Sequence, residues 1–137
     1  MPVELSKDAI DLGIVVTDSE SALGFYRDLL GFRHEGDVPM PVGSGVMHRL
    51  WCGDSLIKLV CWDETPAAAA PPGGPQAATG YRYWTMRVAN LEGIMAECEA
   101  AGVDIVVPVT EVRPGVTIGM VNDPDGNVVE FVDDADD

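Results

Sequence analysis

The chain has 137 residues, 47% of them hydrophobic, and a formal net charge of −15. This length and composition fit one globular domain spanning residues 1–137, or two small repeats that share a core. The negative charge excludes nucleic acid as a partner, and no apolar run approaches the roughly 20 residues that span a bilayer.

Three features of the sequence predict a cytoplasmic protein. Cys52, Cys61 and Cys98 are an odd number of cysteines and form no CxxC pair. Such cysteines are typical of reduced thiols in a protein core. The N-terminus shows no basic segment followed by an apolar one, so no signal peptide is expected.

The first half begins with a predicted strand and helix. Alternating apolar residues predict a strand at 9–16, with Asp11 on the face opposite the apolar side chains. Thr17 and Glu20, three residues apart, match a capping box. Apolar residues at helical spacing then predict a helix at 19–30.

Three strands are expected to complete the first half, at 32–38, 46–52 and 55–62. Gly53 and Asp54 form the expected hairpin turn between the last two. His34 lies in a loop-like polar stretch and is expected to be exposed. The next segment, 63–80, is rich in alanine, proline and glycine and is predicted to be a flexible linker or mobile loop.

The second half repeats this order of elements. Its predicted elements are a strand at 81–88, a helix at 91–101 capped by Asn90, strands at 103–112 and 116–122, and a strand-like run at 128–132. A turn at Asp123 to Gly126 precedes the last run, in which Glu130 is the one charge.

The two halves align at a fixed spacing. A shift of 72 residues places Lys58 on Glu130 and Asp11 on Tyr83, while the helix-ending glycines, Gly31 and Gly102, differ by 71. This internal repeat predicts an α+β fold of two tandem βαβββ modules, 9–62 and 81–133. Their sheets are expected to form a curved mixed sheet around a central cleft, where these paired residues converge.

Nearly the whole chain resembles the vicinal oxygen chelate superfamily. That superfamily includes glyoxalase I, bleomycin-resistance proteins, fosfomycin-resistance enzymes, methylmalonyl-CoA epimerase and extradiol dioxygenases. The motifs that carry the resemblance are Ile10-Asp11-Leu12-Gly13-Ile14-Val15-Val16-Thr17-Asp18, Phe25-Tyr26-Arg27-Asp28-Leu29-Leu30-Gly31-Phe32, and Asp123-Pro124-Asp125-Gly126-Asn127 with Glu130-Phe131. The resemblance implies the same fold and a homodimer, but leaves the reaction open.

In metal-using members of the superfamily, four positions on the first and last strand of each module supply the ligands, usually His or Glu. The resemblance places Asp11, Lys58, Tyr83 and Glu130 at these positions. Only Glu130 is a usual ligand, and protonated Lys58 cannot coordinate a metal. We therefore expect no cofactor; a divalent metal, if bound, would use Glu130 and Asp11.

These four residues are the candidate catalytic groups. Lys58 would polarise a carbonyl or enolate oxygen, Glu130 would act as a general base and Tyr83 as an acid or hydrogen-bond donor. Asp11 would orient Lys58 or face solvent. The alternatives are an ion pair between Lys58 and Glu130 without chemistry, and Tyr83 as a cavity wall.

Strand parity suggests further residues that contact the ligand. A two-residue turn at Gly53 places Arg49 and Trp51 on the face of Lys58 and His48 on the other face. Arg49 would bind a carboxylate. Trp62 has the parity of Lys58. The expected substrate-binding residues are Arg49, Trp51, Trp62 and Tyr81.

Three functions agree with this sequence. The first is a metal-independent lyase, isomerase or epimerase acting on a small carbonyl metabolite, with Lys58 in place of a metal charge. The second is a non-catalytic protein that sequesters a cationic antibiotic, as bleomycin-resistance proteins do. The third is a metal-dependent enzyme with an atypical ligand set. Each predicts a small-molecule ligand.

Overall fold

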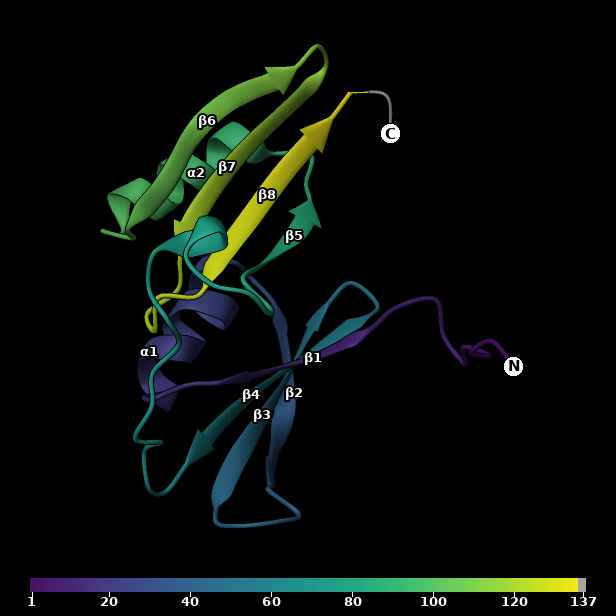
Figure 1. Cartoon of the computed structure of the whole chain (residues 1–137), viewed down its shortest axis with the longest axis vertical. Coiled ribbons are helices and arrows are strands. Elements are labelled where there is room, and N and C mark those ends of the chain that lie inside the picture. Colours follow the sequence, from purple (N-terminus) through teal and green to yellow (C-terminus); the bar gives the residue numbers. More distant parts are fainter. Residues whose placement is uncertain (136–137) are drawn as a thin grey trace. The chain divides into compact units, whose positions relative to one another are not determined.

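The computed structural model describes residues 1–135 and divides into two compact units, Met1–Ala67 and Ala68–Asp137. Each unit contains one four-stranded mixed sheet with a helical segment between its first two strands, arranged as βαβββ (Figure 1). This confirms the predicted α+β class and the duplicated module. Among residues 1–135, no helix is long and apolar enough to cross a membrane.

The first unit pairs its first and last strands side by side. Its elements are β1 (Asp11–Val15), α1 (Ser19–Leu23), the π-helix η1 (Gly24–Leu29), β2 (Arg33–Pro39), β3 (Gly45–Cys52) and β4 (Ser55–Trp62). The strand order is β1-β4-β3-β2; β1 and β4 are parallel and the other neighbours are antiparallel.

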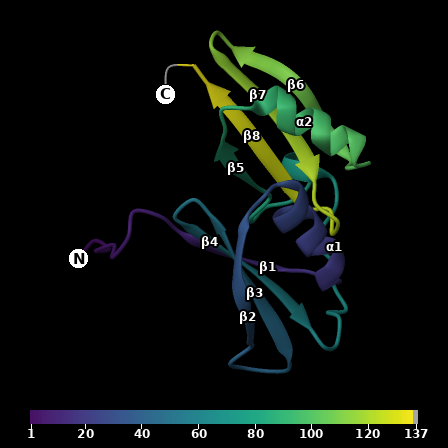
Figure 2. The same ribbon diagram turned by 180° about the vertical axis from the view of Figure 1, so that it is seen from behind.

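The second unit has the same topology. Its elements are β5 (Tyr83–Arg87), α2 (Leu91–Ala100), β6 (Ile105–Arg113), β7 (Val116–Asn122) and β8 (Val128–Asp134). The strand order is β5-β8-β7-β6, again with one parallel pair, β5 and β8. Helix α2 contacts β6, β7 and β8 and lies across one face of this sheet (Figure 2).

Each sheet buries one face against its own helix. In the first unit Ile57 and Leu59 are almost fully buried, as are Phe25 and Tyr26 of η1. In the second, Val129 and Phe131 are buried in the same way, and Glu130 between them is half-buried. Burying a side chain of this size contributes roughly 1.5–3 kcal/mol, so these layers account for much of each unit's stability.

The first helix differs from its prediction in two ways. The N-cap is Asp18, one residue after Thr17, and its carboxylate accepts hydrogen bonds from the Ser21 amide at 3.1 Å and the Ser21 hydroxyl at 2.6 Å. After Leu23 the helix widens into η1, where the Leu30 amide donates to the Phe25 carbonyl five residues back. The predicted single α-helix is therefore two segments.

The predicted helix ends are confirmed more closely than the starts. Gly31 and Gly102 follow the two helices with φ of +82° and +78°, a conformation that glycine adopts without strain. Asn90 occupies the N-cap position of α2, but its side chain makes no capping hydrogen bond. The start of α2 is therefore set without the predicted cap.

The turns before β4 and β8 differ in length. Cys52 pairs with Ser55, which confirms the two-residue turn at Gly53 and Asp54. In the second unit Asn122 pairs with Val128, leaving five residues in the turn. Buried Asp123 organises this longer turn by accepting hydrogen bonds from the amides of Asp125 and Asn127.

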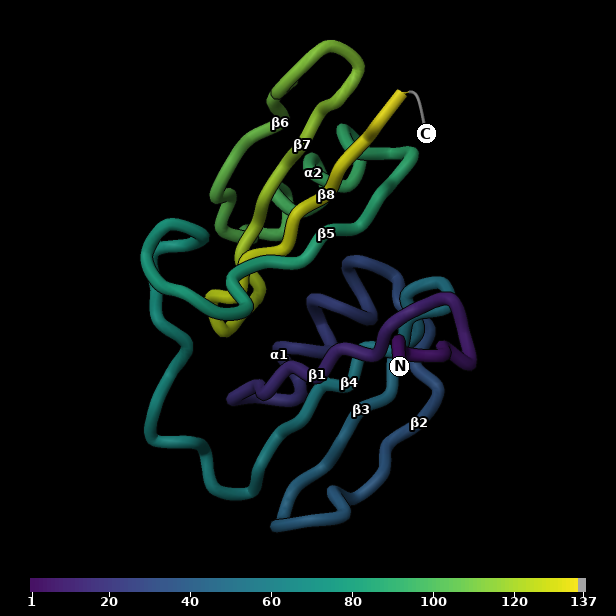
Figure 3. Tube along the Cα trace, turned by 45° about the vertical axis from the view of Figure 1, so that its right-hand side comes forward, coloured from purple at the N-terminus to yellow at the C-terminus, as the bar shows by residue number. Residues whose placement is uncertain are grey.

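The connection from β4 to β5 runs as a long loop in Figure 3. It contains only a short 3-10 turn, η2 (Gly74–Gln76), and no strand. Arg82, just before β5, holds this turn by hydrogen bonds. Its Nε and Nη2 donate to the Gly74 carbonyl at 3.0 and 2.7 Å. The part of the connection nearest β5 is therefore held by the second unit's own hydrogen bonds.

Candidate functional site

The four predicted catalytic residues occupy equivalent positions in the two sheets. Asp11 pairs with Leu56 and Gly13 with Lys58; Tyr83 pairs with Val128 and Thr85 with Glu130. Adding 72 to each first-unit number gives its second-unit counterpart, as the repeat predicted. Asp11 with Lys58, and Tyr83 with Glu130, are therefore diagonal neighbours on matching parallel strand pairs.

These residues lie on the face of each sheet that its own helix does not cover, called here the open face. Lys58 alternates with Ile57 and Leu59, which are buried on the covered face. Glu130 alternates in the same way with Val129 and Phe131. The predicted faces are correct, whereas the catalytic roles stay predictions.

Arg49 and Trp51 share the open face with Lys58, as predicted. Arg49 lies directly opposite Lys58 in the β3–β4 ladder. Glu35 joins the two predicted residues: it accepts from Arg49 Nε at 2.6 Å and from Trp51 Nε1 at 3.0 Å. These bonds lower the pKa of Glu35, Arg49 contributing most, so Glu35 is ionised near neutral pH.

Two more cations surround Trp51. Lys7 Nζ lies 4.9 Å and Arg33 Cζ 5.8 Å from the ring centroid, both within the range of a cation–π interaction. With Arg49 and Lys58 they make four of the chain's eight Lys and Arg residues. A chain of net charge −15 thus concentrates half of its cations on or beside one sheet face.

Asp11 pairs with Lys7 rather than with Lys58. The Lys7 Nζ to Asp11 Oδ1 distance is 2.7 Å. The hydrogen bond from Lys7 is the main cause of a lowered Asp11 pKa, to which the charges of Lys58 and Arg49 add. Lys58 forms no ion pair within the first unit, all of whose residues the structure describes.

On the open face of the second unit, Thr85 positions Glu130. The Thr85 hydroxyl donates to Glu130 Oε1 at 2.6 Å, and Met120 lies opposite Glu130 in the β7–β8 ladder. Tyr83 is 49% exposed, and Tyr81 lies before β5 and is fully exposed.

Trp62 lies at the end of β4, paired with Gly45. Its ring packs on the backbone of Gly43 and Gly45, where an added Cβ would come within 3.0 and 2.9 Å of ring carbons. The Trp62 ring therefore packs against the loop between β2 and β3.

These side chains do not fit the metal site that the superfamily implies. Lys58 presents an ammonium at one ligand position and faces the guanidinium of Arg49. Asp11, at another, is already paired with an ammonium. A divalent cation at this face would meet positive charge, so no chemical step is derived through such an ion.

Sequence reasoning missed Glu35, Lys7, Arg33 and Thr85. Thr85 could have been predicted, because it shares strand parity with Tyr83 and lies beside Glu130. Glu35 could not have been predicted in this way, since β2 has a register irregularity between His34 and Gly36 that strand parity does not reveal.

The prediction for His34 was wrong. His34 belongs to β2 and is half-buried, on the face covered by α1 and η1. It forms a group with Asp37 and buried His48 whose potential ligand atoms all lie within 4.8 Å of one another. This group is separate from the open face, and its side chains are those that bind metal ions in proteins.

The duplicated βαβββ fold, with equivalent residues on matching strands, defines a glyoxalase-type architecture. The family model described as Glyoxalase/Bleomycin resistance protein/Dioxygenase superfamily matches residues 10–131. The chain therefore belongs to this superfamily.

Several solved structures have a similar fold. SMU.1112c is 25% identical with a TM-score of 0.74, over 94% of this chain and 100% of that one. A glyoxalase family protein from Bacillus cereus has 18% identity and a TM-score of 0.79, over 96% and 95%. Leishmania major glyoxalase I, described as trypanothione-dependent, has 20% and 0.70, over 93% and 87%. The last two support the fold alone. A comparison with curated proteins gave no match.

Proposed function

We propose that this protein binds a small oxygenated metabolite that carries negative charge, and acts on it as a metal-independent lyase, isomerase or epimerase. The observation that carries the proposal is the group of cations around Trp51 on the open face. Such a group attracts a carboxylate or enolate and repels a cationic antibiotic. It therefore favours an enzyme over a protein that sequesters cationic drugs.

Lys58 is the proposed contact to the oxygen on which negative charge develops. It has no carboxylate partner in the first unit. Its neighbour on β1 is Gly13, where an added Cβ would meet no atom within 4 Å. An unpaired ammonium beside open space is available to a ligand. Pre-placed positive charge of this kind stabilises an enolate without reorganisation.

Glu130 is the proposed general base. The Thr85 hydroxyl holds Oε1 and leaves Oε2 to take a proton from the carbon next to the carbonyl. The electron pair of that C–H bond then moves onto the carbonyl oxygen. Returning the proton gives an isomer or epimer; expelling a neighbouring group gives a lyase. Tyr83 would supply the proton to the departing or reprotonated atom.

Arg49 and the aromatic residues have binding roles in this proposal. Glu35 occupies Arg49 Nε, so a ligand carboxylate would meet the two Nη groups. Trp51, Trp62 and Tyr81 would contact the rest of the ligand. We also propose a homodimer, which light scattering at micromolar concentration tests directly.

The test is binding and turnover with a panel of carbonyl acids and cationic antibiotics. Glu130→Gln keeps the shape of the side chain but removes the base, so turnover should fall by about 10²–10⁴ while binding persists. Lys58→Met should weaken both. Matched controls are Glu99→Gln on the exposed side of α2 and Arg113→Met at the end of β6.

Two outcomes would overturn the proposal. Full activity of Glu130→Gln would show that Glu130 is not the general base. Tight binding of a cationic antibiotic without turnover, lost in Trp62→Ala or Tyr83→Ala, would establish the sequestering function instead.

A further inference from the structure

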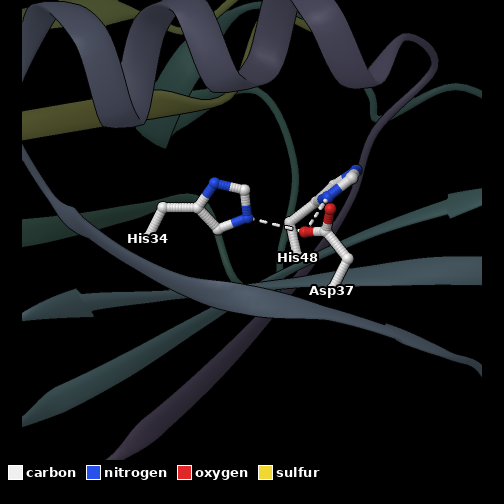
Figure 4. A group of neighbouring side chains, drawn as sticks. All are labelled: His34, Asp37 and His48. Carbon is white, nitrogen blue, oxygen red and sulfur yellow. Dashed lines mark hydrogen bonds and ion pairs between the residues drawn. The ribbon is translucent and has the colours of Figure 1, made fainter.

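His34, Asp37 and His48 meet because of an irregularity in β2. Asp37 pairs directly with His48 across the β2–β3 ladder, and His34 pairs with Leu50. Residues 34 and 37 of a regular strand would point to opposite faces. The register shift between His34 and Gly36 turns them to the same face. Figure 4 shows both imidazole rings directed at the Asp37 carboxylate.

The distances within this group are short. His34 Nε2 lies 2.6 Å and His48 Nδ1 lies 2.7 Å from the same atom, Asp37 Oδ1. Burial would raise the pKa of Asp37, but the hydrogen bonds from His48 and His34 outweigh it and lower the pKa. Asp37 is therefore a carboxylate near neutral pH. Two imidazoles and a carboxylate converge on one point.

We propose that this group is a binding site for a divalent transition-metal ion such as Zn²⁺, with His34 Nε2, His48 Nδ1 and the Asp37 carboxylate as ligands. Two nitrogens and one oxygen suit Zn²⁺ and its neighbours rather than Mg²⁺ or Ca²⁺, which prefer oxygen. Three protein ligands leave a coordination position for water, and Asp37 is 47% exposed, so water can reach the group.

The hydrogen-bond partners of His48 fit the role of a metal ligand both without and with a bound metal ion. Without metal, Nδ1–H donates to Asp37, so Nε2 accepts from the Ser19 hydroxyl at 2.8 Å. With metal on Nδ1, the proton moves to Nε2, and the same Ser19 oxygen accepts it. Ser19 is the first residue of α1, so the bound imidazole would hold the helix start to β3.

The surroundings of His34 oppose the metal-bound state. Arg27 Nη1 lies 3.3 Å from His34 Nδ1, and a guanidinium can only donate. Nδ1 must therefore accept, which leaves the proton on Nε2. Metal on Nε2 would force that proton to Nδ1, facing Arg27. Arg27 must then move away, toward Asp28, to which it already donates at 2.8 Å.

The equivalent positions of the second unit carry no such group. The pair Ile105–Val121 is equivalent to His34–Leu50, each number differing by 71. The same shift takes His48 to Gly119, where an added Cβ would lie 2.6 Å from Met95 Sδ. Apolar packing thus fills this place in one unit, so the polar group in the other is not required by the fold.

The chain contains two histidines, both in this group, so imidazole NMR reports on the site without interference. The experiment is a Zn²⁺ titration of the full chain, followed by imidazole ¹⁵N NMR and calorimetry. At one equivalent both imidazoles should shift and exchange tautomers: His34 from Nε2–H to Nδ1–H, and His48 from Nδ1–H to Nε2–H. The melting temperature should rise with Zn²⁺ concentration.

Variants separate this site from other binding. His48→Gln, His34→Gln and Asp37→Asn should each weaken Zn²⁺ binding by more than about tenfold. Arg27→Met should strengthen it by about tenfold, since it removes the opposing donor. Arg113→Met removes the same charge elsewhere and should leave affinity unchanged. Cys52→Ser with Cys61→Ser removes the two partly exposed thiols, leaving only buried Cys98, and should bind as the wild type does.

Imidazole signals that do not move at one equivalent of Zn²⁺ would overturn the inference. This test uses the wild-type protein alone. Unchanged affinity in Asp37→Asn would do the same. The inference is independent of the proposed function: Glu130→Gln should bind Zn²⁺ normally, and His48→Gln should still bind the metabolite if it folds.

Discussion

Lys58 lies directly opposite Arg49 on adjacent antiparallel strands, so two cationic side chains are neighbours on one sheet face. Like charges in this position destabilise a sheet, by up to about 1 kcal/mol. Glu35 offsets the charge of Arg49, whereas Lys58 has no ion-pair partner in the fully described first unit. Such a cost is typical of a residue retained for binding rather than for stability.

Replacing Lys58 should therefore stabilise the protein. We expect Lys58→Met to raise the free energy of unfolding by about 0.2–1 kcal/mol in urea at low salt. The gain should shrink as salt screens the repulsion. Arg113→Met is the control for net charge. A loss of stability would instead show that the attraction between Lys58 and Asp11, which helps to lower the Asp11 pKa, outweighs this repulsion.

The hydrogen bond from Thr85 should matter for turnover if Glu130 is the base. Thr85→Val keeps the shape of the side chain and frees Oε1. A hydrogen bond to a charged group is worth about 1.5–3 kcal/mol, so kcat should fall by roughly 10- to 100-fold. KM should change little, because Thr85 acts through Glu130. Thr117→Val on β7 is the matched control, and equal losses in both variants would contradict a positioning role.

Glu35 should titrate below the usual range of a glutamate. Its pKa is lowered chiefly by the hydrogen bond from Arg49, then by that from Trp51. A depressed pKa contributes stability that is present above the unfolded-state pKa and is lost as pH falls through the folded-state pKa. The stability difference between wild type and Glu35→Gln should therefore persist at neutral pH and vanish in acid.

Carboxyl NMR measures the Glu35 titration directly. In Arg49→Met the midpoint should move upward toward the ordinary value, whereas Arg113→Met should leave it in place. A midpoint unaffected by Arg49→Met would show that this bond is absent in solution.

Two glycines should respond differently to the same substitution. At Gly119 an added Cβ would lie 2.6 Å from the Sδ of buried Met95, whereas at Gly13 it would meet nothing within 4 Å. Gly119→Ala should destabilise by about 1–3 kcal/mol. Gly13→Ala should be close to neutral. Unfolding of both variants in urea tests the contrast. In a Met95→Ala background, Gly119→Ala should cost less stability than it does in the wild type if the clash is its cause.

The fold was predictable because the same hydrophobic pattern occurs in both halves of the chain. Where a segment of one half is ambiguous, the equivalent segment of the other half indicates its structure. The faces of Lys58, Arg49 and Glu130 followed from strand parity and from a turn whose length Gly53 and Asp54 revealed. These features depend on local sequence, which is why they could be read without coordinates.

The rest depended on features that local sequence does not encode. The irregularity between His34 and Gly36 brings Glu35 to Arg49 and Asp37 to His48. Two overlapping residue pairs could cap the first helix. The structure uses Asp18 with Ser21 instead of the predicted Thr17 with Glu20. Lys7 reaches Trp51 from a segment without secondary structure, which no pattern predicts.

The unequal turns before β4 and β8 make the spacing between the repeats uneven. β5 and β8 match β1 and β4 at 72 residues, whereas β7 matches β3 at 71, as Leu50–Ile57 and Val121–Val129 show. A residue missing before β7 is restored in the turn after it. Length changes in one half thus compensate each other, and the strands that carry Lys58 and Glu130 keep a constant interval while the hairpins between them are free to diverge.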